Sequence, residues 1–327
     1  MGGRHGRRRR WGAIAGSAVV VAALAVVAVV TAQHLHTSSA HSDPSTTMAS
    51  TDPSTPTATP TPTTSHPASS SHPPVRRPVV RPRTVVDPQV RKLAAQLPAG
   101  GVSVAALNTR TGARYSFGAT SGMRTGSVYK LFVLETLLLQ HQDSGTDLSD
   151  YEMSQATPMI EQSDNVAAYK LFEDLGRNDG LNAAAPRLGL HHTIPGQADP
   201  ALTTTSAQDY LALLEDLVRN GPLDSDSRSY ALGLMRNVES DQRWGVGVVA
   251  DPGTTFANKN GWLSVDNSNG EGEGDDDLWL VNSVGIVTVH GQQVLLSVFT
   301  QHGQSYDGGV RLVESLVKTI SPAVVAH

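Results

Sequence analysis

The chain of 327 residues has no cysteine, and only 5% of its residues are aromatic. The lack of cysteine excludes disulfides, thiol catalysis, cysteine-ligated zinc and lipid attachment through an N-terminal cysteine. The formal net charge is only −5, so no global electrostatic signal indicates a nucleic-acid partner. The sequence contains neither a His-Glu-x-x-His pattern nor a phosphate-binding glycine loop that follows a strand. We therefore predict no cofactor, no metal and no nucleic acid.

The first 88 residues do not have the composition of a folded domain. Residues 1–10 are rich in arginine, residues 11–32 are apolar or small without charge, and residues 33–88 are dominated by Ser, Thr, Pro and His. A run of about 20 apolar residues can span a bilayer, and arginines in front of it stay in the cytoplasm. We predict a basic cytoplasmic segment, a signal anchor and a disordered linker over these three ranges. A cleaved signal peptide is the alternative, and either places the rest of the chain outside the cytoplasm.

Residues 89–327 are predicted to form one domain. Helices are expected at Val90–Leu97, from Ser127 through Leu139, and at Val166–Leu175, Ser206–Arg219, Ser227–Val238 and Val310–Ile320. Strands are expected at Val102–Asn108, Ala113–Phe117, Leu278–Val281, Gly285–His290 and Val294–Thr300. Strands at both ends with helices between them indicate an α+β fold whose sheet unites the termini. The acidic run at 270–277 lacks the ligand rhythm of a calcium loop and is expected to be a solvated loop.

The motif Ser127-Val128-Tyr129-Lys130 stands at the start of a predicted helix. Residues three apart lie on one face of a helix, so the serine and lysine side chains are expected to be neighbours. A neutral lysine beside a serine can accept the hydroxyl proton and leave an activated nucleophile. The alternative is that Ser127 caps the helix while Lys130 faces solvent.

Two further motifs follow in the chain. In Ser163-Asp164-Asn165 the serine could relay a proton and the asparagine could donate to a substrate carbonyl, although all three residues are also good helix caps. In Lys259-Asn260-Gly261 a strand lysine could attract a substrate carboxylate, with Gly261 allowing close backbone approach. The alternative for this motif is a hairpin tip, because Asn-Gly favours a type I′ turn.

The three motifs, in this order within a cysteine-free exported domain, resemble those of the class A β-lactamase-like serine hydrolases. Shorter similarities lie at Gly101–Val104, Ile194–Gly196, Thr203–Thr205 and Ser297–Thr300. The resemblance implies an antiparallel sheet flanked by helices, plus a helical lobe, with the site between them. The resemblance also implies a role for each motif residue. Ser127 would be the nucleophile, Lys130 the proton acceptor, Ser163 the proton shuttle, Asn165 a substrate ligand and Lys259 the carboxylate anchor. The backbone N–H groups of Ser127 and Trp262 would form the oxyanion hole.

The sequence departs from this family pattern in four respects. Asn260 replaces the usual threonine or serine, Trp262 is expected to narrow the site, and the spacing 163 − 127 = 36 indicates a trimmed helical lobe. The family also carries a deacylating glutamate shortly before Ile-Pro, where counting back places Arg187 in this chain. Arginine stays protonated and cannot act as a general base. His191 or His192 could take its place, although both are expected to be surface residues.

From these motifs we predict an extracytoplasmic, single-pass membrane serine hydrolase that acts as a monomer. Its substrate would be a β-lactam or a peptidoglycan-like amide, and it would form an acyl-enzyme that is hydrolysed slowly. If the protein is an enzyme of another kind, the alternative is a penicillin-binding D,D-peptidase or esterase. If it is not an efficient enzyme, the alternative is a catalytically weak domain that binds cell-wall fragments.

Overall fold

The computed structural model describes residues 86–219, 221–265 and 278–325. The predicted basic segment, the signal anchor, residues 33–85 of the linker and the acidic loop at 270–277 lie outside these residues. Residues 86–88 were predicted to belong to the disordered linker, but they are helical. None of the helices within the described ranges is long and apolar enough to cross a membrane. The first described element is a helix that begins at Val86.

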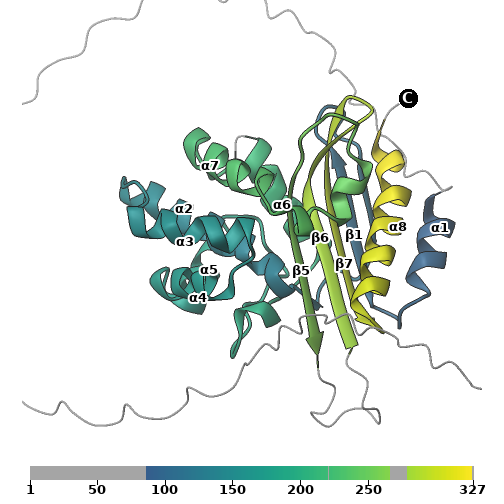
Figure 1. Cartoon of the computed structure of the whole chain (residues 1–327), viewed down its shortest axis with the longest axis horizontal. Helices are drawn as coiled ribbons and strands as arrows, with labels where there is room; N and C mark the ends of the chain where they lie inside the picture. Colours follow the sequence, from purple (N-terminus) through teal and green to yellow (C-terminus); the bar gives the residue numbers. More distant parts are fainter. Residues whose placement is uncertain (1–85, 220, 266–277, 326–327) are drawn as a thin grey trace, which may run out of the picture. The chain divides into compact units, whose positions relative to one another are not determined.

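A five-stranded antiparallel sheet forms the centre of the domain, with the strand order β2-β1-β7-β6-β5 (Figure 1). The strands are β1 (Val102–Asn108), β2 (Arg114–Gly118), β5 (Ala257–Val265), β6 (Leu278–Val289) and β7 (Gln292–Gly303). Strand β1 pairs with β7 near the other end of the chain, with Ala105 opposite Ser297. The sheet thus unites the two ends of the domain, as predicted, and leaves β5 as one edge.

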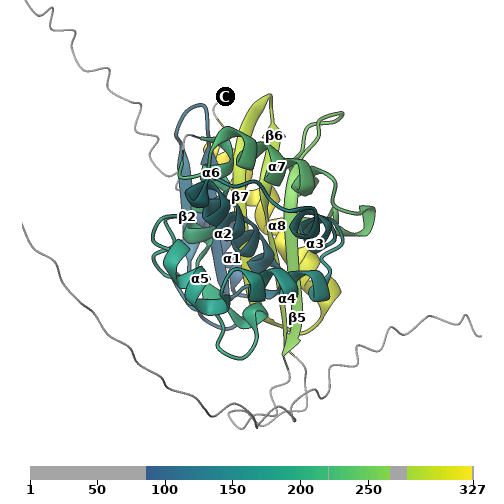
Figure 2. The same cartoon turned by 90° about the vertical axis from the view of Figure 1, so that its left-hand side faces the viewer.

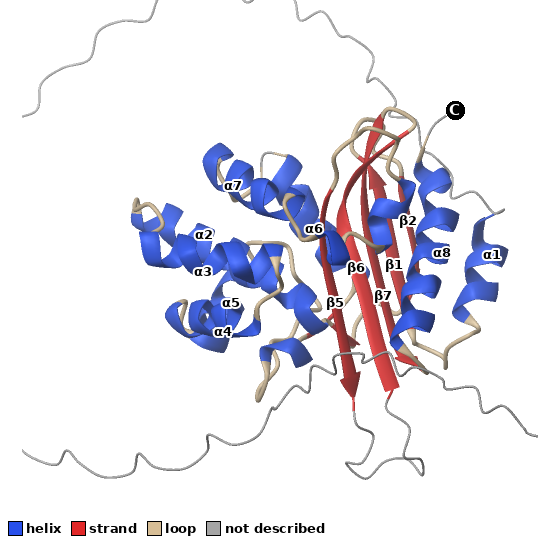
Figure 3. Cartoon of the chain, in the orientation of Figure 1, coloured by secondary structure: helices blue, strands red, loops and turns tan. Residues whose placement is uncertain are grey.

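Helices cover both faces of the sheet, as Figures 2 and 3 show. On one face lie α1 (Val86–Ala94) and α8 (Tyr306–Val324). On the other face a helical lobe contains α2 (Tyr129–Ser144), α3 (Asp150–Glu161), α4 (Asn165–Asp174), α5 (Arg177–Ala184), α6 (Ala207–Val218) and α7 (Ser225–Arg236). Each face buries its own apolar cluster, one between the sheet and the lobe and one beneath α8. This arrangement confirms the predicted α+β fold, with an antiparallel sheet flanked by helices and a helical lobe.

Helix α2 is the central helix of the lobe. Every residue from Tyr129 to Leu139 is buried, which explains why this helix is apolar on all sides rather than on one stripe. It is preceded by a short 3₁₀ helix, η1 (Gly126–Val128), and ends at Gly145 in the left-handed conformation. Ser127 therefore lies just before the α-helix, where the backbone turns into it.

Some predicted boundaries were wrong. Helix α1 starts earlier than expected because proline is tolerated in a first turn, and it ends before Leu97-Pro98 because a residue that precedes proline disfavours the helix. The two β-like segments between 278 and 290 form the single strand β6, which continues through buried Asn282 and Ser283. The predictions also omitted α3 and α5.

Candidate active site

Ser127 and Lys130 are neighbours, as the first motif predicted. The Nζ atom of Lys130 lies 3.2 Å from the Oγ atom of Ser127. Lys130 is fully buried, while Ser127 remains partly exposed. The alternative, in which Lys130 faces solvent, is excluded.

The second motif meets the same lysine. Lys130 Nζ lies 2.5 Å from the backbone oxygen of Ser163, 3.2 Å from its Oγ and 2.7 Å from Asn165 Oδ1. The helix-capping role belongs to Asp164, whose Oδ1 accepts from the Ala167 N–H at 2.7 Å and starts α4. Ser163 has a φ of +58°, and this left-handed conformation is uncommon for a residue with a side chain. The backbone there directs Ser163 and Asn165 to Lys130.

Lys259 completes the cluster from the edge strand β5. Its Nζ donates to Ser163 Oγ at 2.8 Å and to the backbone oxygen of Asn260 at 2.9 Å. The residue pairs with Val284 in the middle of the β5–β6 ladder, so the hairpin-tip alternative is excluded. Ser163 Oγ thus lies between the two buried lysines.

Burial lowers the pKa of both lysines. Desolvation lowers the pKa of Lys130 to about 7, although the charges of Asp164 and Asp199 act in the opposite direction. Desolvation, and next the charge of Lys130, lowers the pKa of Lys259 well below its usual range. Within the described part of the chain no carboxylate lies within 4.0 Å of either lysine nitrogen. A negatively charged ligand would supply the missing partner and would favour the charged form of these lysines.

The backbone of β5 lies directly against η1, and two glycines permit it. A Cβ atom on Gly261 would lie 2.6 Å from the Val128 nitrogen and 2.8 Å from the Ser127 nitrogen. A Cβ atom on Gly126, which has a φ of +50°, would lie 3.1 Å from the Trp262 nitrogen. The backbone nitrogens of Ser127 and Trp262 therefore meet at one junction beside the serine hydroxyl.

The side chains of Asn260 and Trp262 point away from the site, because side chains alternate along a strand. Asn260 Nδ2 donates to the backbone oxygens of Gln242 and Trp244, and Ser283 Oγ donates to Asn260 Oδ1 at 2.6 Å. The Trp262 ring packs 6.1 Å from Trp244 and 5.6 Å from Tyr306. The prediction that this ring narrows the site was wrong, and only its backbone lies at the junction.

Arg187, the residue at the counted position of the family glutamate, lies away from the serine, and His191 and His192 are exposed surface residues, as predicted. Arg187 forms an ion pair with Asp143, which is 13 residues after Lys130 on α2 and hence about 20 Å further along the helix axis. The His192 N–H donates to Asp209 Oδ2 at 2.7 Å, and its ring faces the same carboxylate. The chain segment next to the serine is instead residues 200–203, since Thr125 bonds to the carbonyls of Ala201 and Thr203.

One positioning residue was not anticipated from the sequence. Asn282 Nδ2 donates to the backbone oxygens of Arg124 and Thr125, at 2.8 and 3.0 Å, and its Oδ1 accepts from the Thr300 N–H. It ties the segment before Ser127 to two strands of the sheet. A buried polar residue within an otherwise apolar strand was the available signal. No group of three or more potential metal ligands is found among the described residues.

The fold is that of the class A β-lactamases and of PBP-A. A mutant of PBP-A, solved as an acyl-enzyme complex with penicillin G, aligns with a TM-score of 0.63 and 20% identity over 75% of this chain and 97% of that one. The TLA-3 extended-spectrum β-lactamase aligns with a TM-score of 0.61 and 17% identity over 72% of this chain and 97% of that one. A class A β-lactamase from Bacteroides cellulosilyticus aligns with a TM-score of 0.61 and 17% identity over 74% of this chain and 98% of that one. At these identities the likeness shows the fold.

The family model described as "Beta-lactamase enzyme family" matches residues 139–324, more than half of the chain. The chain belongs to this family. "Putative lipoprotein LppW" of Mycobacterium tuberculosis and its counterpart in Mycobacterium bovis are 29% identical to it over 205 residues. That alignment covers 58% of this chain and 64% of each relative, so it spans less than two thirds of their length.

Proposed function

We propose that the protein is a serine hydrolase that forms an acyl-enzyme at Ser127 with β-lactams or related amides. The observation that carries this proposal is the surroundings of Lys130 Nζ. A neutral amine has two N–H donors and one lone pair, and the two nearest acceptors are the backbone oxygen of Ser163 and Asn165 Oδ1. Once these take the two hydrogens, the lone pair is left to accept from a hydroxyl, and the hydroxyls of Ser127 and Ser163 both lie 3.2 Å away.

The remaining residues fit the steps of such a reaction. Lys130 takes the hydroxyl proton while Ser127 Oγ attacks the substrate carbonyl. The two backbone N–H groups at the η1–β5 junction stabilise the oxyanion. Ser163 Oγ, held by both lysines, passes a proton to the leaving nitrogen. Lys259 attracts the substrate carboxylate, and Asn165 binds the carbonyl of the acyl side chain.

We propose that hydrolysis of the acyl-enzyme is slow. Residues 200–203 lie next to the serine, and the carboxylate that precedes them, Asp199, caps this segment by accepting the Ala201 N–H at 2.8 Å. We expect an acyl-enzyme to persist where the nearby carboxylate is engaged in this way, as in a penicillin-binding protein rather than in an efficient β-lactamase. A D,D-peptidase is the second candidate for this reason.

We propose an extracytoplasmic location with anchoring through residues 11–32. The relatives named lipoproteins and the arginine-rich, then apolar, N-terminal sequence support it. Since the sequence has no cysteine, a lipid thioether is not the means of attachment.

The test of the activity is a time course of intact-protein mass after penicillin G is mixed with the full-length protein. We expect an adduct that forms once per chain and lasts for hours, and no adduct in Ser127→Ala. Rapid loss of the adduct with turnover of the drug would instead make the protein a β-lactamase with another base. Absence of any adduct would refute the acyl-enzyme proposal.

A further inference from the structure

A cavity of about 580 Å³ lies at the end of α1, beside the edge strand β2. One wall is the last turn of α1 with the segment that follows it, and the other wall is residues 117–119 at the end of β2. The volume is within the range of about 300–1,000 Å³ that small-molecule sites have. The proposed active site lies against β5, at the opposite edge of the sheet (Figure 1). The cavity is therefore a separate site.

The lining of this cavity is apolar with one exception. Leu97, Val102 and Phe117 contribute the larger side chains, and alanine, glycine and proline contribute most of the rest. Leu97 and Phe117 are only partly buried, so a ligand with an apolar chain would remove more of their surface from water. Of the described residues that line the cavity, only Arg91 has a polar or charged side chain. The lining therefore favours an apolar ligand with one polar end.

The guanidinium of Arg91 is positioned, but it has no ion-pair partner in the described part of the chain. Its Cζ atom lies 5.6 Å from the centre of the Phe117 ring, and this cation–π contact holds it over the apolar wall. Asp87, one helical turn earlier, accepts a hydrogen bond from the Tyr115 hydroxyl at 3.0 Å. Within the described ranges no carboxylate lies within 4.0 Å of Arg91. Its N–H groups are therefore available to a carboxylate, which a guanidinium matches in a bidentate manner.

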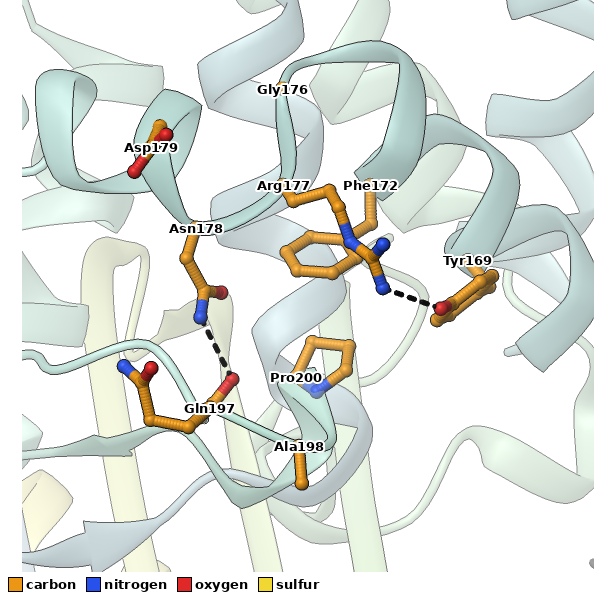
Figure 4. A pocket seen from close by; sticks show the side chains of 10 residues that line it. Tyr169, Phe172, Gly176, Arg177, Asn178, Asp179, Gln197, Ala198 and Pro200 are labelled. Atoms are coloured by element: carbon orange, nitrogen blue, oxygen red, sulfur yellow. Dashed lines mark hydrogen bonds between the residues drawn. The ribbon is translucent and has the colours of Figure 1, made fainter. Parts of the chain in front are cut away.

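A second cavity, between α4 and residues 196–200, also has an arginine over aromatic rings (Figure 4). There, however, the Arg177 guanidinium donates to Tyr169 Oη at 2.7 Å and lies 3.9 Å from the carboxylate of Glu173. Polar side chains also line that cavity, among them Asn178 and Asp179. An apolar lining, together with a guanidinium that no described carboxylate contacts, thus distinguishes the cavity at α1.

We infer that the cavity at the end of α1 binds a long-chain fatty acid. The acyl chain lies along the apolar walls, and the carboxylate binds Arg91. A neutral chain of the same length would leave the guanidinium without a partner, and a cationic one would be repelled by it. One cavity with one cation suits a single chain with a single negative charge. The proposed anchor at residues 11–32 would keep the domain near a membrane that supplies such chains.

The test is photo-crosslinking of the full-length protein in phosphatidylcholine vesicles with a palmitate that carries a diazirine in its chain. Labelling is measured by mass spectrometry on the tryptic peptide Tyr115–Arg124, which contains the wall at 117–119. We expect at least fivefold more label on this peptide than on Leu312–Lys318, a tryptic peptide of α8. Excess palmitate should compete for the site, whereas excess hexadecanol or hexadecyltrimethylammonium should not.

Two variants and one control assign the label to the cavity, and none of them alters either peptide. Arg91→Gln removes the cation, and Ala95→Trp fills the cavity from an exposed position, so each should lower the labelling of Tyr115–Arg124 at least fivefold. Arg236→Gln, at an exposed position on α7, should leave it unchanged. Labelling equal to that of the α8 peptide, equal competition by hexadecanol, or full labelling in either cavity variant would overturn the inference. Loss of label when the vesicles contain phosphatidylglycerol would make a membrane phospholipid the ligand and would overturn the fatty acid assignment.

Discussion

The protonation of Lys130 sets the pH dependence of acylation. Because burial lowers its pKa to about 7, the amine is about half neutral at pH 7 and about 1% neutral at pH 5. Only the neutral form can accept the proton of Ser127, so the acylation rate constant should fall about 50-fold between these pH values. Above pH 8 nearly all of the amine is neutral, and the rate should reach a plateau.

The assay is rapid-quench mass spectrometry with penicillin G at saturating concentration from pH 5 to pH 9. At a saturating concentration the measured rate constant reports the attack by Ser127. It does not report the binding of the substrate carboxylate, which the charge of Lys259 governs. Lys130→Arg is the informative variant, because arginine stays protonated in proteins and should abolish acylation at every pH. A wild-type rate that is flat from pH 5 to pH 8, or an active Lys130→Arg, would refute the role of Lys130 as base.

Three further predictions concern residues that hold the site or the lobe. Glu135→Gln should raise the free energy of unfolding more at pH 7 than near pH 4.5. The reason is that the fully buried, unpaired carboxyl has a pKa raised well above 4.5, so wild-type stability is full below that pH and is lost as pH rises. Urea unfolding at both pH values, with exposed Glu239→Gln as control, measures the difference, and an equal shift at both would contradict it. Gly261→Ala should slow acylation by about 100-fold, because the new Cβ displaces β5 from the Ser127 backbone nitrogen; an unchanged mass-spectrometric rate would contradict the contact. Asn282→Ala removes three hydrogen bonds and should cost about 3 kcal/mol in urea unfolding, and a loss below 1 kcal/mol would show that they contribute little.

Much of the fold could be predicted because its signals are local. The apolar run after Ser127, the apolar strand segments and the glycine turns depend on neighbouring residues only. Helix α3 could also have been found, because Ser149 and Glu152 form a capping box that is legible in the sequence. Helix α5 gives no such signal, since it contains Gly180 and starts after a glycine that offers no side-chain cap.

The candidate site was predicted as a set of residues but not as an arrangement. The spacing of Ser127 and Lys130 fixes their contact within one helical turn. The approach of Ser163 and Lys259 depends on the packing of the lobe against β5, which no local pattern encodes. Trp262 was misplaced because the alternation of side chains along the strand from Lys259, which puts it on the opposite face, was not applied. Arg187 was misplaced because counting along a shortened segment does not preserve position in space.

The central claim is that Ser127 is the acylated residue. The most direct test is peptide mapping by mass spectrometry of the full-length protein after reaction with penicillin G. We predict one modified peptide, the one that contains Ser127, with no modification in Ser127→Ala and normal modification in Ser154→Ala, which alters an exposed serine on α3. Modification at any other residue, or equal modification of Ser127→Ala, would contradict the account.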